Sequence, residues 1–161
     1  MNVAPEVTSA SPWQSHRVMT FAGQHDTHIE TGDEYRTMSL ADVFAMEPLS
    51  RDKSHSPAMI PSSYCEHDGR AHDRQRDAGS FVALCGDVDK DDHSLAAVRG
   101  AVRSLAGDAA WLIYSSAHAR DGDMRWRIIL PLATPLPFAD WHDAQHAFFD
   151  HMEGRGIAMD R

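Results

Sequence analysis

Asp87 and Asp89, separated by one residue, carry the most evident chemistry of this chain. They stand at the end of an apolar segment, residues 80–89, and side chains two residues apart on a strand point the same way. Their like charges repel unless a cation lies between them. Mg²⁺ and Mn²⁺ prefer carboxylate and phosphate oxygens, and a pair of such ions can hold both reacting oxygens of a phosphoryl transfer. The pair predicts a metal site, with solvated strand-end residues as the alternative.

Further candidate groups follow along the chain: Ser116 with His118, Arg125 with Arg127, and Asp160. A histidine can donate to a phosphate or transfer a proton, and arginine suits bidentate phosphate contacts. A third carboxylate can complete a metal site. Taken singly, each is more typical of an ordinary surface residue, so a shared site requires a fold that brings them together.

Apolar periodicity predicts the elements that would position these groups. The expected order is a strand over 80–89, a helix from Ser94 to Gly107, strands over 111–114 and 124–130, a helix from Phe138, and a strand over 156–160. This order is typical of an α+β fold of the split β-α-β type, the ferredoxin-like palm with an antiparallel sheet. In that topology all the candidate groups reach one edge of the sheet, with the fourth strand beside the first.

Residues 1–79 have weaker patterning, and we expect a loosely structured α/β extension there, followed by the palm over 80–161. Within the extension, Ser39 can cap a short helix that ends before Pro48. Residues 66–79 are dense in Asp, Arg and His without an apolar period, which predicts a solvated loop or mobile segment.

Composition limits the classes of function. The chain of 161 residues is 42% hydrophobic and carries a formal net charge of −9. This charge argues against a wide surface that grips nucleic acid non-specifically, because such binding depends on Lys and Arg. Apolar runs are too short for a membrane span, no signal peptide is visible, and two cysteines make no disulfide framework. We therefore expect a cytoplasmic protein that does not enter membranes.

Three motifs together resemble the archaeo-eukaryotic primase superfamily, in the form found in primase-polymerases of phages, prophages and plasmids. They are Cys85-Gly86-Asp87-Val88-Asp89, Ser116-Ala117-His118 and Met159-Asp160. The stretches 111–118 and 125–132 are also similar, so the resemblance covers roughly residues 80–160. Gly86 stands where the family usually has an apolar residue, and family members usually continue well beyond the third acid. The palm is therefore expected to be truncated.

The resemblance implies a metal-dependent nucleotidyltransferase of DNA replication. Asp87, Asp89 and Asp160 would bind Mg²⁺ or Mn²⁺. The nucleotide would be bound by Ser116, by His118 at its phosphates, and by Arg125 and Arg127 in the lining of the pocket. Partners would be nucleoside triphosphates, a template and primer, and a replicative helicase.

Three alternatives stay open. The chain could be a catalytically incomplete primase-like fragment that binds nucleic acid or a partner protein. It could be another palm-type enzyme, such as a nucleotide cyclase, although the Ser-x-His and Arg-x-Arg motifs favour the primase. It could also be a small acidic protein in which short motifs match by accident.

Overall fold

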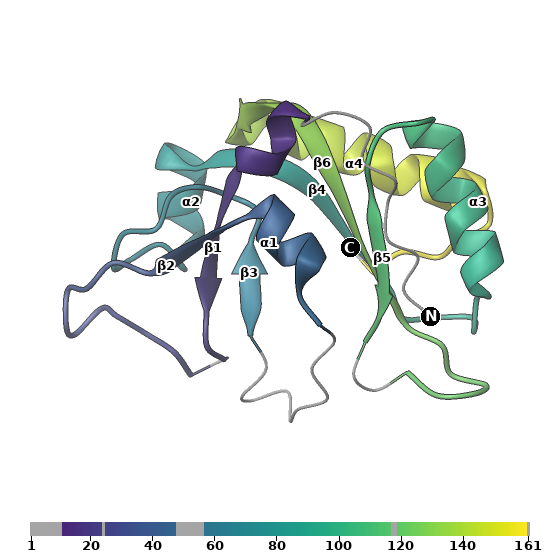
Figure 1. The fold of residues 1–161 in the computed structure, drawn as a ribbon, viewed down its shortest axis with the longest axis horizontal. Coiled ribbons are helices and arrows are strands. Elements are labelled where there is room, and N and C mark those ends of the chain that lie inside the picture. The colour runs from purple at the N-terminus through teal and green to yellow at the C-terminus, as the bar shows by residue number, and fades with distance from the viewer. Residues whose placement is uncertain (1–10, 24, 48–56, 117–118, 161) are drawn as a thin grey trace. The chain divides into compact units, whose positions relative to one another are not determined.

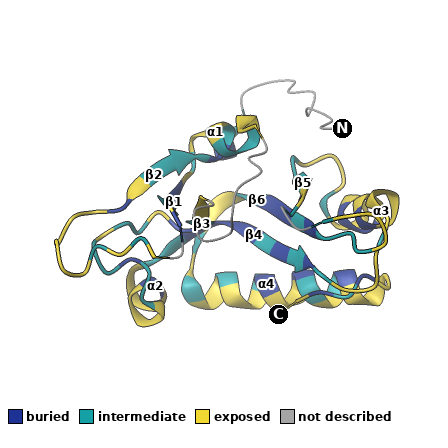
Figure 2. Ribbon diagram, turned by 90° about the horizontal axis from the view of Figure 1, so that it is seen from below, coloured by how far each residue is buried: buried dark blue, intermediate teal, exposed yellow. Residues whose placement is uncertain are grey.

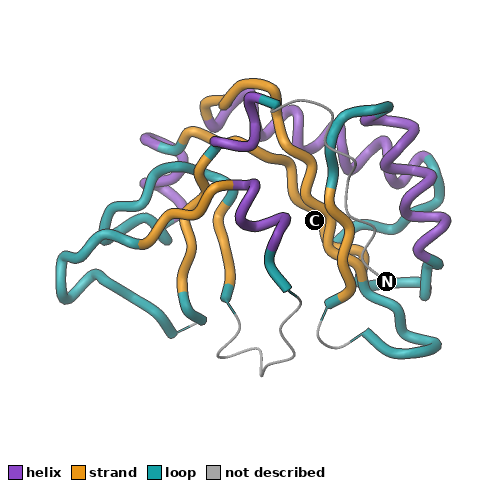
Figure 3. Tube along the Cα trace, viewed as in Figure 1, coloured by secondary structure: helices purple, strands orange, loops and turns teal. Residues whose placement is uncertain are grey.

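The computed structural model describes residues 11–23, 25–47, 57–116 and 119–160. Its helices and strands are, in chain order, η1 (Pro12–Ser15), β1 (Arg17–Phe21), β2 (Arg36–Ser39), α1 (Leu40–Ala45), β3 (Ala58–Ile60), α2 (His72–Ala78), β4 (Ser80–Val88), α3 (Leu95–Ala106), β5 (Leu112–Ser115), β6 (Trp126–Pro137) and α4 (Phe138–Gly154). The protein is α+β, as predicted (Figures 1 and 3).

The strands form two three-stranded sheets, with the orders β2-β1-β3 and β4-β6-β5. In the first, β1 pairs antiparallel with both of its neighbours. In the second, β5 pairs antiparallel with β6, from Leu112 opposite Ile129 to Ser115 opposite Trp126. The second sheet therefore places the strand that ends in the acids beside the strand that carries Arg127.

The chain divides into two compact units. The β5 unit comprises Leu84–Pro131 with His142–Arg161, and the β1 unit comprises Ala10–Ala83 with Leu132–Trp141. The chain therefore passes between the units within β4, β6 and α4. The first crossing falls after Ala83, and the boundary expected at residue 79 stays a prediction.

Local sequence accounts for α3 and for the core that it helps to build. Ser94 Oγ accepts a hydrogen bond of 3.2 Å from a first-turn amide, and Gly107 ends the helix with φ of +59°. Val98 and Val102, one turn apart, are completely buried. The apolar core of the β5 unit also contains Leu84, Val88, Ala101, Trp126, Ile128, Ile129, Leu130, Phe148, Met152, Ile157 and Met159. Figure 2 shows buried residues concentrated in β4 and β6.

The prediction that the strand after residue 124 ends at Pro131 is wrong. β6 runs through Pro131 and on to Pro137. β5 reaches only as far as Ile129 along β6. On the β5 side of β6, a proline beyond that point removes no ladder hydrogen bond.

Residues 156–160 form no strand, although one was expected there. Side chains of α4 instead form hydrogen bonds with backbone groups at the outer edge of β4. Trp141 Nε1 donates to the Ala83 carbonyl at 2.9 Å, and the Gln145 side-chain amide both accepts from the Cys85 amide at 3.1 Å and donates to the Cys85 carbonyl at 2.6 Å. A fourth strand has little edge left to pair with, because these groups already cover it.

The β1 unit is more regular than the expected loose extension. The short helix capped by Ser39 is confirmed as α1, with the Ser39 hydroxyl accepting from an amide of its first turn. Residues 66–79, expected to be a loop, contain α2. Its buried residue is Gln75, whose Nε2 donates to the carbonyls of Tyr64 at 3.0 Å and Gly69 at 2.5 Å. Because a polar side chain anchors this helix, the sequence shows no apolar period that would predict it.

No helix within the described ranges combines the length and apolar character that a membrane crossing requires.

Candidate metal and nucleotide site

Asp87 and Asp89 converge on one positive charge. Arg127, from the neighbouring strand β6, directs Nη1 at both carboxylates: it contacts Asp87 Oδ2 and lies 3.5 Å from Asp89 Oδ1. Val88 between them is fully buried on the opposite face. The alternation of a strand thus directs both acids to one point, as their spacing predicted.

Electrostatics at this point are unfavourable for a bare carboxylate. Burial raises the pKa of Asp87 above its ordinary value, and the charges of Asp89 and Asp160 raise it further, while the Arg127 guanidinium opposes the shift. Asp89 Oδ1 is buried and has no hydrogen-bond partner among the described residues. A divalent cation with open coordination positions would fit this arrangement, because it would stabilise both carboxylates.

Asp160 lies beside Asp87. Its amide donates to the Asp87 carbonyl at 2.9 Å, which makes a single antiparallel bridge. Residues directly opposite each other across such a pair present their side chains on one face. The Asp160 side chain is exposed, and within the described ranges no three His, Cys, Asp or Glu side chains form a group that could hold a metal. The three acids therefore share a face without converging in this structure.

The Ser-x-His motif is described only at its first residue. The Ser116 amide donates to the Arg125 carbonyl at 2.9 Å, which ties the end of β5 to the approach to β6. Ser116 Oγ is buried and has no hydrogen-bond partner in the described part of the chain. His118 lies outside the described residues.

The two arginines are not equivalent. Arg125 forms a two-point contact with Asp123, at 3.3 and 3.1 Å, and does not pair with the β4 acids as Arg127 does. Between them Trp126 is buried, and its Nε1 donates to the His93 carbonyl at 2.7 Å. Only Arg127 of the predicted pair therefore lies at the acidic end of β4.

Tyr114 is a neighbour of the site that sequence reasoning missed. It lies directly opposite Arg127 in the β5–β6 register, so the two side chains share a face of the sheet. Tyr114 is 39% exposed, and partial burial together with Cys85 and Asp87 raises the pKa of its hydroxyl. The sequence signal for Tyr114 was its position in the strand, two residues after Leu112 and therefore on the same strand face. An exposed aromatic ring beside an arginine is suited to stacking on a base.

The loop after β4 has an unusual backbone conformation that the sequence did not predict. Asp91 and Asp92 have positive φ of 66° and 44°. Asp92 Oδ1 accepts from the Met124 amide at 2.8 Å. Two successive non-glycine residues in this region carry backbone strain, which is common at functional loops. The acidic run that ends at Asp92 is visible in the sequence, but the positive φ of its last two residues was not predictable from it.

Gly86, the departure from the family pattern, has a packing cause. A Cβ at this position would lie 2.5 Å from Met159 Cε and 2.9 Å from Phe148 Cε1. Glycine therefore allows α4 and the segment before Asp160 to approach β4 closely.

Cys85 is not a nucleophile in this setting. Burial raises the pKa of its thiol to about 12, so the thiol is neutral at physiological pH.

A cavity in the β1 unit, of about 240 Å³, is lined by Thr27, Ile29, Tyr35, His67, Asp68, Arg70 and Ala71. Its charged groups are engaged: Asp68 accepts from Tyr64 at 2.8 Å and from Arg74 at 2.5 Å. The cavity is also smaller than typical ligand sites of about 300–1,000 Å³. The acids of β4 carry the stronger case for chemistry.

No protein-family model matches the chain, and the comparisons with curated proteins and with solved structures find no match either.

Proposed function

We propose that residues 80–161 form the palm of a primase-polymerase that transfers nucleotides from nucleoside triphosphates in the replication of a phage or other mobile element. The observation that carries the proposal is the convergence of Asp87 and Asp89 on a single cationic group. Asp89 Oδ1 supports it as well, because this buried oxygen has the long ion pair with Arg127 but no hydrogen-bond partner among the described residues, which leaves it able to accept a metal.

The strand arrangement supports the palm. The order β4-β6-β5, with α3 and α4 following β4 and β6 in the chain, is the order of a split β-α-β sheet. The bridge between Asp160 and Asp87 lies where the fourth strand of such a sheet would begin. We propose that this single bridge is the reduced equivalent of that strand.

Each residue then has a defined role. Asp87, Asp89 and Asp160 would hold Mg²⁺ or Mn²⁺, which supplies charge neutralisation on the phosphates and activation of the attacking hydroxyl. In the free protein Arg127 balances the carboxylates, and with nucleotide bound its guanidinium turns to the phosphates. Tyr114 stacks on the base, while Ser116 and His118 donate to phosphate oxygens. A template, a primer and a replicative helicase are the partners of this reaction.

One observation favours a second candidate. Arg127 already occupies the cationic position between the two carboxylates. If that ion pair persists, the acids are structural, and the chain is a catalytically incomplete primase-like fragment that binds nucleic acid or a partner protein.

Nucleoside-triphosphate binding with and without Mn²⁺ tests the proposal. We expect binding that requires Mn²⁺ and is abolished in the double variant Asp87→Ala, Asp89→Ala. The matched control is Asp108→Ala, Asp121→Ala, which removes the same charge from exposed positions and should bind normally. Equal binding by both double variants, or no binding by the folded wild type, would reject the nucleotidyl-transfer proposal and favour the second candidate.

A further inference from the structure

Two histidines, His142 and His146, stand one turn apart on the exposed side of α4. Their Nε2 atoms lie 3.1 Å from each other, and their rings meet edge to face with centroids 4.3 Å apart. The His142 side chain is 50% exposed, and His146 is exposed as well. Both imidazoles therefore reach solvent, and their Nε2 atoms form a hydrogen bond in which one ring donates and the other accepts. A metal ion bound between the two nitrogens would displace the proton that they share.

This spacing suits a shared metal ion. Two nitrogens each about 2.1 Å from one ion lie about 3 Å apart at the right angle of tetragonal or octahedral Ni²⁺ and Cu²⁺, and about 3.4 Å apart at the tetrahedral angle of Zn²⁺. Histidines separated by four residues on one helix face are a recurrent pair of zinc ligands. The helix backbone holds the two rings in place, so little conformational freedom is lost when a metal binds.

We propose that His142 and His146 form a surface site for a divalent transition-metal cation of the zinc, nickel or copper class. Neutral imidazole is a preferred ligand of these ions. Within the described part of the chain no third His, Cys, Asp or Glu side chain completes a cluster. The ion is therefore held by two nitrogens, and water fills the remaining positions.

Asp143 assists the pair electrostatically. Its Oδ1 lies 3.8 Å from His142 Nδ1, which is too long for a hydrogen bond but within ion-pair range. A carboxylate near the second ring nitrogen of a metal-binding histidine helps to orient the ring. The contribution is small, because the Asp143 side chain is 91% exposed.

The imidazole site is chemically separate from the acids of β4. Nitrogen ligands favour transition metals, whereas Mg²⁺ requires oxygen. The proposal is also independent of nucleotidyl transfer. The variant Asp87→Ala, Asp89→Ala should therefore keep the imidazole site, and loss of that site should leave any Mn²⁺-dependent nucleotide binding intact.

Calorimetric titration with Ni²⁺, on the full chain without a histidine tag, tests the site. The second imidazole acts as an intramolecular ligand, and such linkage strengthens binding by about 10²–10⁴-fold. We expect His146→Ala to weaken the tightest Ni²⁺ site by about 10² or more. The matched control is His146→Ala with Ala147→His, which keeps the number of histidines but places the second ring on a different helix face.

The relocated variant should bind as weakly as His146→Ala. Circular dichroism should show equal helix content in all three proteins, since both positions are exposed. A Ni²⁺ concentration that saturates the wild-type site but lies below the weakened affinity of the variants should raise Tm for the wild type alone. Wild-type affinity in the relocated variant, or the absence of a Ni²⁺ site that depends on His146, would overturn the proposal.

Discussion

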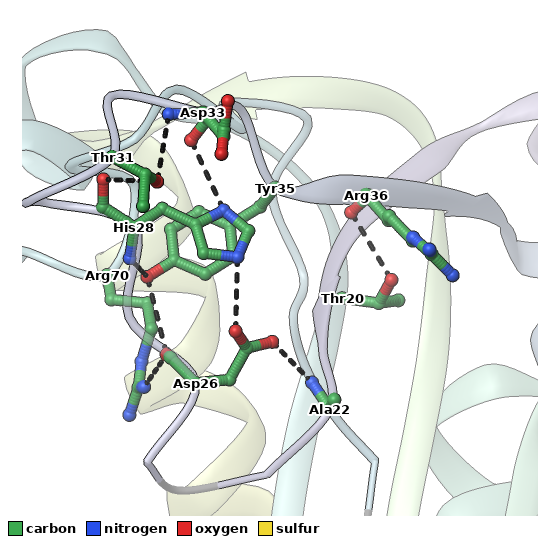
Figure 4. Close-up of polar contacts among 9 residues, drawn as sticks. All are labelled: Thr20, Ala22, Asp26, His28, Thr31, Asp33, Tyr35, Arg36 and Arg70. Carbon is green, nitrogen blue, oxygen red and sulfur yellow. Dashed lines mark hydrogen bonds and ion pairs between the residues drawn. The ribbon is translucent and has the colours of Figure 1, made fainter.

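Asp26 of the β1 unit and Asp87 of the β5 unit are both partly buried carboxylates, yet their surroundings differ. Asp26 Oδ2 accepts from the Ala22 amide at 2.7 Å, and its Oδ1 lies 3.1 Å from His28 Nε2 (Figure 4). Its backbone carbonyl accepts from the Tyr35 hydroxyl at 3.4 Å and from Arg70. Each oxygen of Asp26 thus has a partner.

The surroundings of Asp87 are less complete. Asp87 and Asp89 share one guanidinium, the pKa of Asp87 is raised, and Asp89 Oδ1 has no hydrogen-bond partner among the described residues. Burial of a charge is costly unless it is well paired. The comparison indicates that the Asp26 network stabilises a loop, whereas the acids of β4 carry a cost that bound metal would relieve.

Removal of the packing beneath Asp87 and Asp89 should have the largest effect on stability. Phe148 is 1% exposed and lies beside Gly86, so Phe148→Ala should cost about 3–5 kcal/mol in the free energy of unfolding. Leu40→Ala in the β1 unit should cost a similar 2–5 kcal/mol, because Leu40 is fully buried. Urea unfolding measures both.

The two variants should differ in Mn²⁺ affinity, measured at a temperature where both remain folded. Phe148→Ala should weaken it by displacing β4, and Leu40→Ala should not. Equal Mn²⁺ affinity in the two variants would contradict the assignment of the metal site to the end of β4.

Gly86→Ala should have a smaller effect. The added methyl meets Met159 and Phe148, and overpacking of this kind costs about 1–3 kcal/mol. The matched control is Gly100→Ala in α3, where a Cβ meets no atom within 4 Å, and which should stabilise the protein by about 0.5–1 kcal/mol. The two changes are identical in chemistry and opposite in predicted sign. Destabilisation by both would argue against close packing at Gly86.

Asparagine substitutions should have the smallest effects, and they compare the surroundings of Asp26 and Asp87 directly. Asp26→Asn should cost about 1 kcal/mol, because it removes the charged partner of His28. Asp87→Asn should stabilise the protein at pH 7 by about 0.5 kcal/mol or less, since the Asp87 side chain is 45% exposed and solvent screens the effect.

The pH dependence of the second variant has a definite sign. A raised pKa means that the folded state binds the Asp87 proton more tightly than the unfolded state. Wild-type stability therefore falls as pH rises from about 4, the ordinary Asp value, through the raised pKa. The advantage of Asp87→Asn should grow over that window and then level off. An advantage that shrinks with rising pH would contradict the raised pKa.

Much of the β5 unit was predictable, because its signals are local. The capped helix α3, the strand β5 and the helix α4 follow from apolar period, a Ser cap and a Gly end. The common face of Asp87 and Asp89 follows from strand alternation alone.

What escaped prediction depends on contacts between distant residues. The Gln145 amide that replaces a neighbouring strand at Cys85, and the Gln75 amide that anchors α2, are polar side chains whose partners no periodicity reveals. The pairing of Arg125 with Asp123 is a different case: the two residues are close in sequence, but the sequence does not show which carboxylate an arginine will pair with.

Binding of Mn²⁺ alone, followed by the electron paramagnetic resonance signal of the free ion, tests the central claim most directly. The wild type should bind Mn²⁺, and Asp87→Asn with Asp89→Asn should weaken that binding by about tenfold or more, whereas His146→Ala should leave it unchanged. Equal Mn²⁺ binding by the wild type and the double asparagine variant would contradict a metal site at the end of β4.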